Sequence, residues 1–267
     1  MKKLIKTTVL TVLMLGAPGA LADGPQLSGF LDTGMGGALD NIADARPGVN
    51  EAELNVSGAV DGASYRLDVE LGADGAAVEQ ANVGYTFHKG SKTGLTMGIF
   101  NSPWGSEGLD PTGRNLISRS VMRTSLVADN LTGMALSSQP HAMVGITAIA
   151  AVNNSYALRL DLDFISQLSL GLTGMNDTSG TTVDVDAQVR AIDGLTLDVE
   201  YNQHLDAGTM GIYSMVNYDI TDAAGLAVRF DHLDMGAGAT QMVAVGPDYN
   251  MNQHLNFRLE WNMNVNS

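Results

Sequence analysis

Polar and apolar residues alternate along most of this chain. The pattern is clearest between residues 50 and 87, where three successive segments follow it. In the middle segment Tyr65, Leu67 and Val69 alternate with Arg66, Asp68 and Glu70. A period of two predicts strands with one apolar and one polar face. The polar face carries acids, amides and arginine, which suit water better than a packed core. A sheet with one oily and one charged face fits a transmembrane barrel, which meets lipid outside and water inside.

The same alternation continues to the end of the sequence. It predicts fifteen strands, at residues 27–35, 50–60, 63–71, 78–87, 94–100, 130–138, 141–152, 155–164, 167–175, 181–191, 195–203, 209–220, 225–233, 240–246 and 254–263. Asp61-Gly62, Ser166, Asp193-Gly194 and residues 221–224 are typical of tight turns, and we expect them on one side of the sheet.

The predicted number of strands, fifteen, is odd. Bacterial single-chain barrels have an even number of antiparallel strands. Residues 118–127 are one candidate for a sixteenth strand; the other option is that the sequence stops one strand early. We therefore expect an all-β, antiparallel, up-and-down transmembrane barrel of about 16 strands, within a range of 14 to 16. It would form one domain over residues 23–267, with a loop folded inward.

The first 22 residues resemble a cleaved secretory signal peptide. Lys2, Lys3 and Lys6 precede an apolar stretch that ends in small residues at 20–22. The alternative is an N-terminal membrane anchor, but the apolar stretch is short and is followed by Gly and Pro. This leader would carry the chain through the inner membrane.

Composition narrows the compartment and the partners. Without the leader the chain keeps about 11 basic residues against 29 acidic ones, a net charge near −18, which excludes binding to nucleic-acid phosphates. The acidity favours either plain solubility or a cation-favouring lumen and rim. The chain has no Cys, so neither disulfides nor a lipid-anchored Cys stabilise it. Aromatic residues make up only 6%, a thin supply for the aromatic girdles of a membrane barrel.

The longest break in the strand pattern, at residues 101–116, is the candidate constriction. A loop of this length without its own structure is usually functional or disordered. Folded into the lumen, it would set two acids, Glu107 and Asp110, against three bases, Arg114, Arg119 and Arg123. Opposed charges would create a transverse field that filters solutes by charge. The alternative is a solvated external loop whose charges pair locally.

Strand parity predicts which charged residues line the lumen. A charge on the lipid face would cost ~2–4 kcal/mol at mid-membrane, so their confinement to one face supports a barrel. The main candidates are Arg66, Asp68, Glu70, Arg159, Asp161, Asp163, Asp184, Asp186 and Arg190; Glu53, Asp198, Glu200, Arg229, Asp231, Arg258 and Glu260 share the same parity. For any single residue, an ion pair that stabilises the wall is the simpler interpretation.

Catalytic and metal motifs are missing from the sequence pattern. None of the five His residues has a metal-ligand spacing such as HExxH, and no GxSxG elbow occurs. Residues 176–180 offer too few ligands for a Ca²⁺ loop. We therefore expect no enzyme activity, no metal and no cofactor. Two alternatives stay open: an outer-membrane hydrolase that uses a His and a Ser, and a secreted or surface β-sheet protein that self-associates through an unpaired edge.

The first half of the chain resembles a β-barrel porin family of Gram-negative outer membranes. The matching segments are AELNVSG, YRLDVELGADGAAVEQANVGY, GLTMGIFNSPWGSEG, ISRS and NLTGMAL, with Phe100, Pro103, Gly105 and Glu107 ahead of Ser118-Arg119-Ser120. The resemblance covers roughly residues 25–155. It implies an outer-membrane pore, surrounded by lipid and compatible with a homo-oligomer, for passive diffusion of small hydrophilic solutes or ions.

Overall fold

The computed structural model describes residues 5–16, 25–38, 46–72 and 75–265. Most of these residues form strands. The strands are β1 (Ile5–Gly16), β2 (Gln26–Ala38), β3 (Arg46–Val60), β4 (Ala63–Gly72), β5 (Gly75–His88), β6 (Thr93–Asn101), β7 (Asn130–His141), β8 (Val144–Ala151), β9 (Ser155–Ile165), β10 (Leu168–Asp177), β11 (Gly180–Ile192), β12 (Leu195–His204), β13 (Thr209–Asp219), β14 (Ala224–Asp234), β15 (Ala239–Asn252) and β16 (Leu255–Asn264). A 3₁₀ turn, η2 (Pro111–Gly113), and one short helix, α1 (Val121–Leu126), complete the described structure. Among the described residues no helix is long and apolar enough to cross a membrane.

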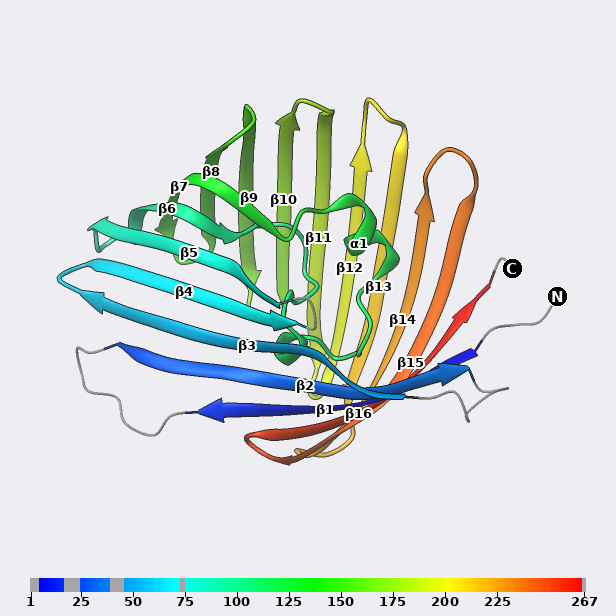
Figure 1. Ribbon diagram of the computed structural model, residues 1–267. Helices are drawn as coiled ribbons and strands as arrows, with labels where there is room; N and C mark the ends of the chain where they lie inside the picture. Colours follow the sequence, from blue (N-terminus) through cyan, green and yellow to red (C-terminus); the bar gives the residue numbers. More distant parts are fainter. Residues whose placement is uncertain (1–4, 17–24, 39–45, 73–74, 266–267) are drawn as a thin grey trace.

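Each strand pairs antiparallel with its neighbours in sequence, and β1 pairs with β16 to close the ring (Figure 1). The fifteen predicted strands correspond one to one to β2–β16. The expectation of an all-β, antiparallel, up-and-down fold is therefore confirmed.

The suggestion of a strand at residues 118–127 is wrong. This segment runs into α1, which begins after Ser120. The Ser120 Oγ accepts a hydrogen bond from the backbone N–H of Arg123 at 3.0 Å, an N-cap that satisfies a free amide of the first helical turn. The local Ser-x-x-Arg sequence thus favours a helix start over a strand.

The sixteenth strand lies instead within the predicted leader. In the structure β1 takes the place between β16 and β2. Residues 5–16 read IKTTVLTVLMLG and lack the regular polar positions of the other strands. Removal of residues 1–22, as the sequence predicts, would leave the fifteen strands that the alternation identifies.

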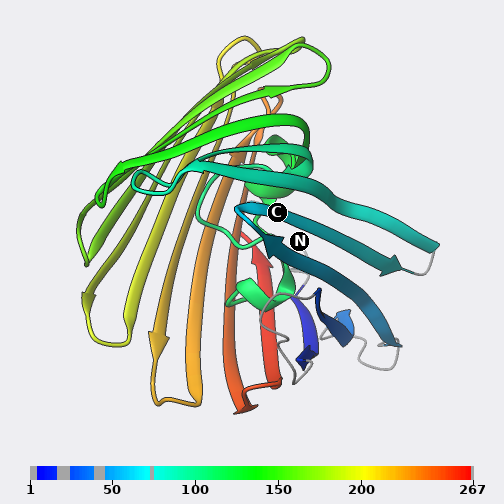
Figure 2. The same cartoon turned by 90° about the vertical axis from the view of Figure 1, so that its left-hand side faces the viewer.

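The long connection starts at the opposite end of the barrel from the predicted tight turns. Every odd-numbered strand from β3 onward turns into the next strand at the end that carries the predicted tight turns. There Asp61 and Gly62 have φ of 50° and 86°, as a two-residue hairpin turn requires. Residues 102–129, between β6 and β7, start at the other end. They fold inside the ring, where α1 packs against β12, β13 and β14 (Figure 2).

Polarity is inverted relative to a water-soluble protein. Large apolar side chains on alternate strand positions point outward and are exposed, among them Leu54, Val83, Leu158, Val185, Val216 and Leu259. The largest fully buried side chains are mostly charged or polar: Arg123, Arg229, Glu200, Glu260, Asn202, Asp68, Asp184 and Asp231. Fully buried charges and extensive exposed apolar surfaces are both rare in ordinary globular proteins.

Candidate functional site: the loop inside the barrel

Buried carboxylates on the wall bind the backbone of the internal loop. Glu200 on β12 accepts a hydrogen bond from Ser106 N at 3.0 Å. Glu260 on β16 accepts from Ile117 N at 2.5 Å, from Ser118 N at 2.9 Å and from the Ser118 hydroxyl. Both glutamates are fully buried. Charge-assisted bonds from backbone N–H groups hold the path of the loop without depending on its side chains.

Two wall arginines complete the anchoring. Arg229 on β14 donates to Ser118 O at 2.5 Å, pairs with Asp231 at 2.9 Å and lies 3.7 Å from the Glu107 carboxylate. Arg258 on β16 donates to Pro111 O at 2.6 Å. The guanidinium fork suits several acceptors at once, so each arginine ties the loop to the wall.

An apolar patch on β13–β15 receives the rest of the loop. Met122 of α1 and Leu116 pack with Tyr213, Met215, Ala227 and Ala244 in one buried cluster. Gly211 on β13 makes room for α1, because a Cβ at this position would lie 2.3 Å from Met122 Cγ. The loop covers the inward face of these strands, and this is why that face is partly apolar.

The predicted constriction residues separate into two groups. Glu107 and Arg123 are buried in the contact between loop and wall: Glu107 accepts from Ser120 N at 2.9 Å, and Arg123 donates to Trp104 O at 2.9 Å. They do not face each other across the lumen as the sequence suggested. Asp110 and Arg114 form the second group, which lies against the wall at β3.

Arg119 lies between these two groups. It pairs with Asp129 and donates to Leu109 O at 2.9 Å. Its side chain keeps 23% of its surface exposed and that of Asp129 keeps 35%. The pair therefore stabilises the loop and also presents charge to the lumen.

The surroundings shift the pKa values of the two loop residues that face β3, Asp110 and Arg114. Burial, with Glu53 nearby, raises the pKa of Asp110 above its ordinary value of 3.8. Burial and the neighbouring Arg119 lower the pKa of Arg114. Arg114 Nη2 lies 3.9 Å from the Glu51 carboxylate on β3, a longer contact than the other ion pairs of the loop. The β3 side of the lumen therefore carries more negative than positive charge.

The predicted lumen-wall residues form two ion-pair networks on the inner face. On β9–β11 Arg159 binds Asp161 at 2.7 Å and Asp186 at 2.8 Å. On β4 Arg66 binds Asp68 at 2.6 Å. The Arg66 and Asp161 side chains are both 42% exposed. Among the other predicted wall residues Asp184 is buried, Glu70 is half-buried, and Asp163 and Arg190 are exposed near strand ends.

Several functional residues escaped the sequence prediction. Glu79 has the parity of the lipid face. However, it is the extra residue of a bulge in β5, so it has no partner on β4, and its neighbour Gln80 faces inward. Asp129 follows the observed helix α1 and lies outside every predicted strand. The polar contacts of Ser118 and Ser120 depend on the loop fold and have no sequence signature beyond the N-cap.

The comparisons with known proteins agree with this architecture. No protein-family model matches the sequence, and a search of curated proteins finds no match. Among solved structures a variant of Rh. blastica porin is 12% identical, with a TM-score of 0.58 over 99% of this chain and 100% of that one. OmpT of Vibrio cholerae is 10% identical, with a TM-score of 0.56 over 97% and 96%. The chain has the fold of a porin. At such low identity the likeness concerns the fold alone.

Proposed function

We propose that the protein is an outer-membrane porin, a water-filled channel for passive diffusion of small hydrophilic solutes or ions. The observation that carries this proposal is the inverted polarity of a closed ring. The outward positions are exposed and apolar, whereas the inward positions hold the buried charges. All the described strands except β8, which has 8 residues, have 9–15 residues, and a tilted strand needs about 9–11 to cross a bilayer. A Gram-negative outer membrane is the compartment in which such barrels occur.

The internal loop would set the width and the charge preference of the channel. Its anchors to β12, β14 and β16 hold it across the interior rather than at the mouth. On one side of the lumen Asp110 of the loop lies near the acids of β3 and β4, and the exposed charges of Asp161 and Asp129 add to them. We therefore expect cations to pass more readily than anions.

A hydrolase built on a Ser and a His is the weaker candidate. Ser179 and His204 do meet, with Ser179 Oγ 3.2 Å from His204 Nε2. However, His204 Nδ1 accepts a hydrogen bond from Ala207 N, so in the neutral ring Nε2 carries the proton. A protonated Nε2 cannot take the proton of Ser179, and the Ser179 hydroxyl already donates to Asp177 at 2.5 Å. This arrangement lacks the general base that a serine nucleophile needs.

Self-association through an unpaired strand edge requires that β1 be absent from the ring. With β1 between β2 and β16 the described ring has no free edge. Without β1 the edges of β2 and β16 would each need a new partner, which they could find in each other or in a second copy. Detergent-free solubility of the folded protein would favour this structural alternative.

Planar-bilayer recording tests the porin proposal directly. The purified protein is first shown to be folded by heat-modifiable gel mobility. We expect stepwise conductance and, in a KCl gradient, a reversal potential of the sign set by K⁺. Electrical silence from protein that passes the folding test would overturn the proposal.

A further inference from the structure

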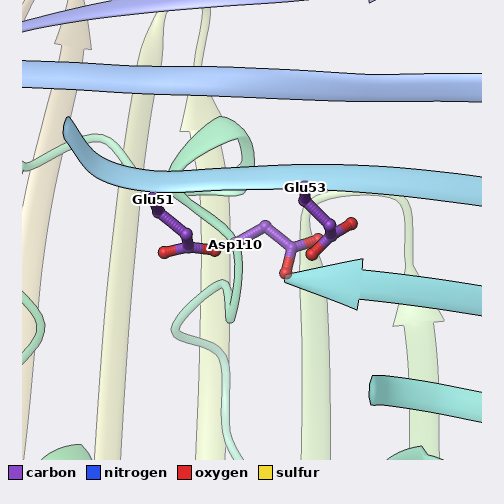
Figure 3. A group of neighbouring side chains, drawn as sticks. All are labelled: Glu51, Glu53 and Asp110. Carbon is purple, nitrogen blue, oxygen red and sulfur yellow. The ribbon is translucent and has the colours of Figure 1, made fainter. Parts of the chain in front are cut away.

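Carboxylates from three separate segments converge on the β3 side of the lumen. Glu51 and Glu53 come from β3 and Asp110 comes from the internal loop. One oxygen of each lies within 4.8 Å of the others (Figure 3). Glu79 on β5 adds a fourth carboxyl group, in contact with that of Glu53. Three chain segments thus bring four acids to one place.

Two bulges lie next to these acids. In β3 the register shifts between Val49 and Glu51, and in β5 it shifts between Val78 and Gln80. Val49 and Val78 stay on the outer face, 58% and 52% exposed. Glu51 directly follows the shift in β3 and shares the face of Glu53, whereas Glu79 is the unpaired residue of the shift in β5. Bulges of this kind re-aim side chains and are common at functional sites.

Positive charge near the four acids is scarce. Among the described residues the one ion pair to any of them is the 3.9 Å contact of Arg114 with Glu51. No ion pair reaches Glu53, Glu79 or Asp110 within the part of the chain that the structure describes. Arg66 and Arg119 act on the group only from a distance, without an ion pair to it. Four carboxylates with a single ion pair among them repel one another, and a bound cation or proton would relieve this repulsion.

Glu53 supplies an independent sign of a missing ligand. Its side chain is only 5% exposed and points toward Asp110 (Figure 3). Its Oε1 accepts a hydrogen bond from Asn55, but its Oε2 is buried without a hydrogen-bond partner. A buried carboxylate oxygen without a donor is unusual in a native protein and calls for a cation or another partner.

We propose that Glu51, Glu53 and Asp110 bind a Ca²⁺ ion, with Glu79 at its edge, and that this ion ties the internal loop to β3. The set holds oxygen donors alone, as a hard cation requires, and it lacks the His and Cys ligands that zinc prefers. Ca²⁺–oxygen bonds of about 2.3–2.6 Å allow two ligands on opposite sides of one ion to lie roughly 4.8 Å apart. The oxygens of the three carboxylates lie within that span of one another.

The bound ion would act on the proposed channel in two ways. It would fix Asp110, and with it the loop around η2, against the wall. It would also neutralise negative charge at the narrow part of the lumen and so weaken the cation preference. This consequence rests on the proposed porin function, whereas binding itself does not.

Calorimetric titration of the folded, detergent-solubilised full barrel with CaCl₂ tests the site. We expect saturable binding of one ion per chain, and at least tenfold weaker binding in the Glu53→Gln/Asp110→Asn double variant. Both changes keep side-chain size and remove charge. Asp161→Asn is the matched control, because it removes a lumen carboxylate outside the group, and it should bind Ca²⁺ like the wild type.

Two results would overturn the site. One is the lack of stoichiometric binding to protein that keeps its heat-modifiable mobility. The other is equal binding by the double variant and the wild type. Since calorimetry needs no conductance, a silent channel that still binds Ca²⁺ would refute the porin and leave the metal site standing.

Discussion

The contact of Glu260 with residues 117–118 is the strongest polar anchor of the internal loop. We expect Glu260→Ala to release this part of the loop while the barrel stays folded, because the strand ladder does not depend on this side chain. The substitution removes acceptors for two backbone N–H groups, at 2.5 and 2.9 Å, and for the Ser118 hydroxyl. A hydrogen bond to a charged group contributes about 1.5–3 kcal/mol.

Two such bonds at the low end give about 3 kcal/mol, which corresponds to roughly a hundredfold rise in the population of the released loop. Trypsin measures this population, since Arg114 and Arg119 flank the anchor. If opening is fast relative to cleavage, the cleavage rate follows the population of the open form. The rate should therefore rise by up to the same factor, with larger open-channel current noise.

Asp161→Asn serves as the control for this experiment, because Asp161 binds Arg159 and, among the described residues, makes no hydrogen bond or ion pair with the loop. Its cleavage rate should equal that of the wild type. Unchanged cleavage and unchanged noise in folded Glu260→Ala would refute the account of how the loop is held.

Three further expectations follow from the structure. Gly211→Ala should loosen α1 and raise tryptic cleavage, because its Cβ would lie 2.3 Å from Met122 Cγ. Adding Met122→Ala should relieve most of this clash, leaving only the 3.0 Å contact with Met122 Cβ, so the two effects should not add. As the pH is lowered, the cation preference should start to fall while the pH is still above 3.8, the ordinary aspartate pKa, because the raised pKa of Asp110 makes this group lose its charge early. The reversal potential of Asp110→Asn should change less steeply with pH than that of the wild type. Equal slopes would contradict this. The charges that face Asp110 are Glu51, Glu53, Glu79, Asp68, Arg66 and Arg114. Intact-mass spectrometry of protein extracted from the outer membrane should find a chain that begins at Asp23, whereas a retained residue 5–16 segment would mean that β1 is a permanent strand.

The alternation of residues was sufficient to predict the wall of the barrel. Each of the fifteen predicted strands is present, because the period of two is imposed separately on every strand by lipid outside and water inside. The prediction failed where another constraint overrides this period. Glu79 has outward parity, but the bulge in β5 shifts the register by one residue, and a bulge leaves no clear mark in a single sequence.

The internal loop was harder to predict, since its path is set by contacts distant in sequence. Glu260 lies 142 residues from Ser118, and Glu200 lies 94 residues from Ser106. One signal was nevertheless present. The inward positions of β13 include Gly211, Tyr213 and Met215, whereas most other strands are polar there. A strand that is apolar on both faces within a two-faced barrel marks the surface on which a loop docks.

Side-specific thiol labelling tests the central claim, that one face of each strand meets water and the other meets lipid. The chain contains no Cys, so each introduced Cys is unique. On β9, Asp161 points to the lumen side with its side chain 42% exposed, and Leu158, 57% exposed, has the opposite parity. In a lipid bilayer a charged, water-soluble thiol reagent should modify Asp161→Cys and lower the single-channel current in steps. Leu158→Cys should stay unmodified. Equal labelling of the two variants, or labelling of Leu158→Cys alone, would contradict the account.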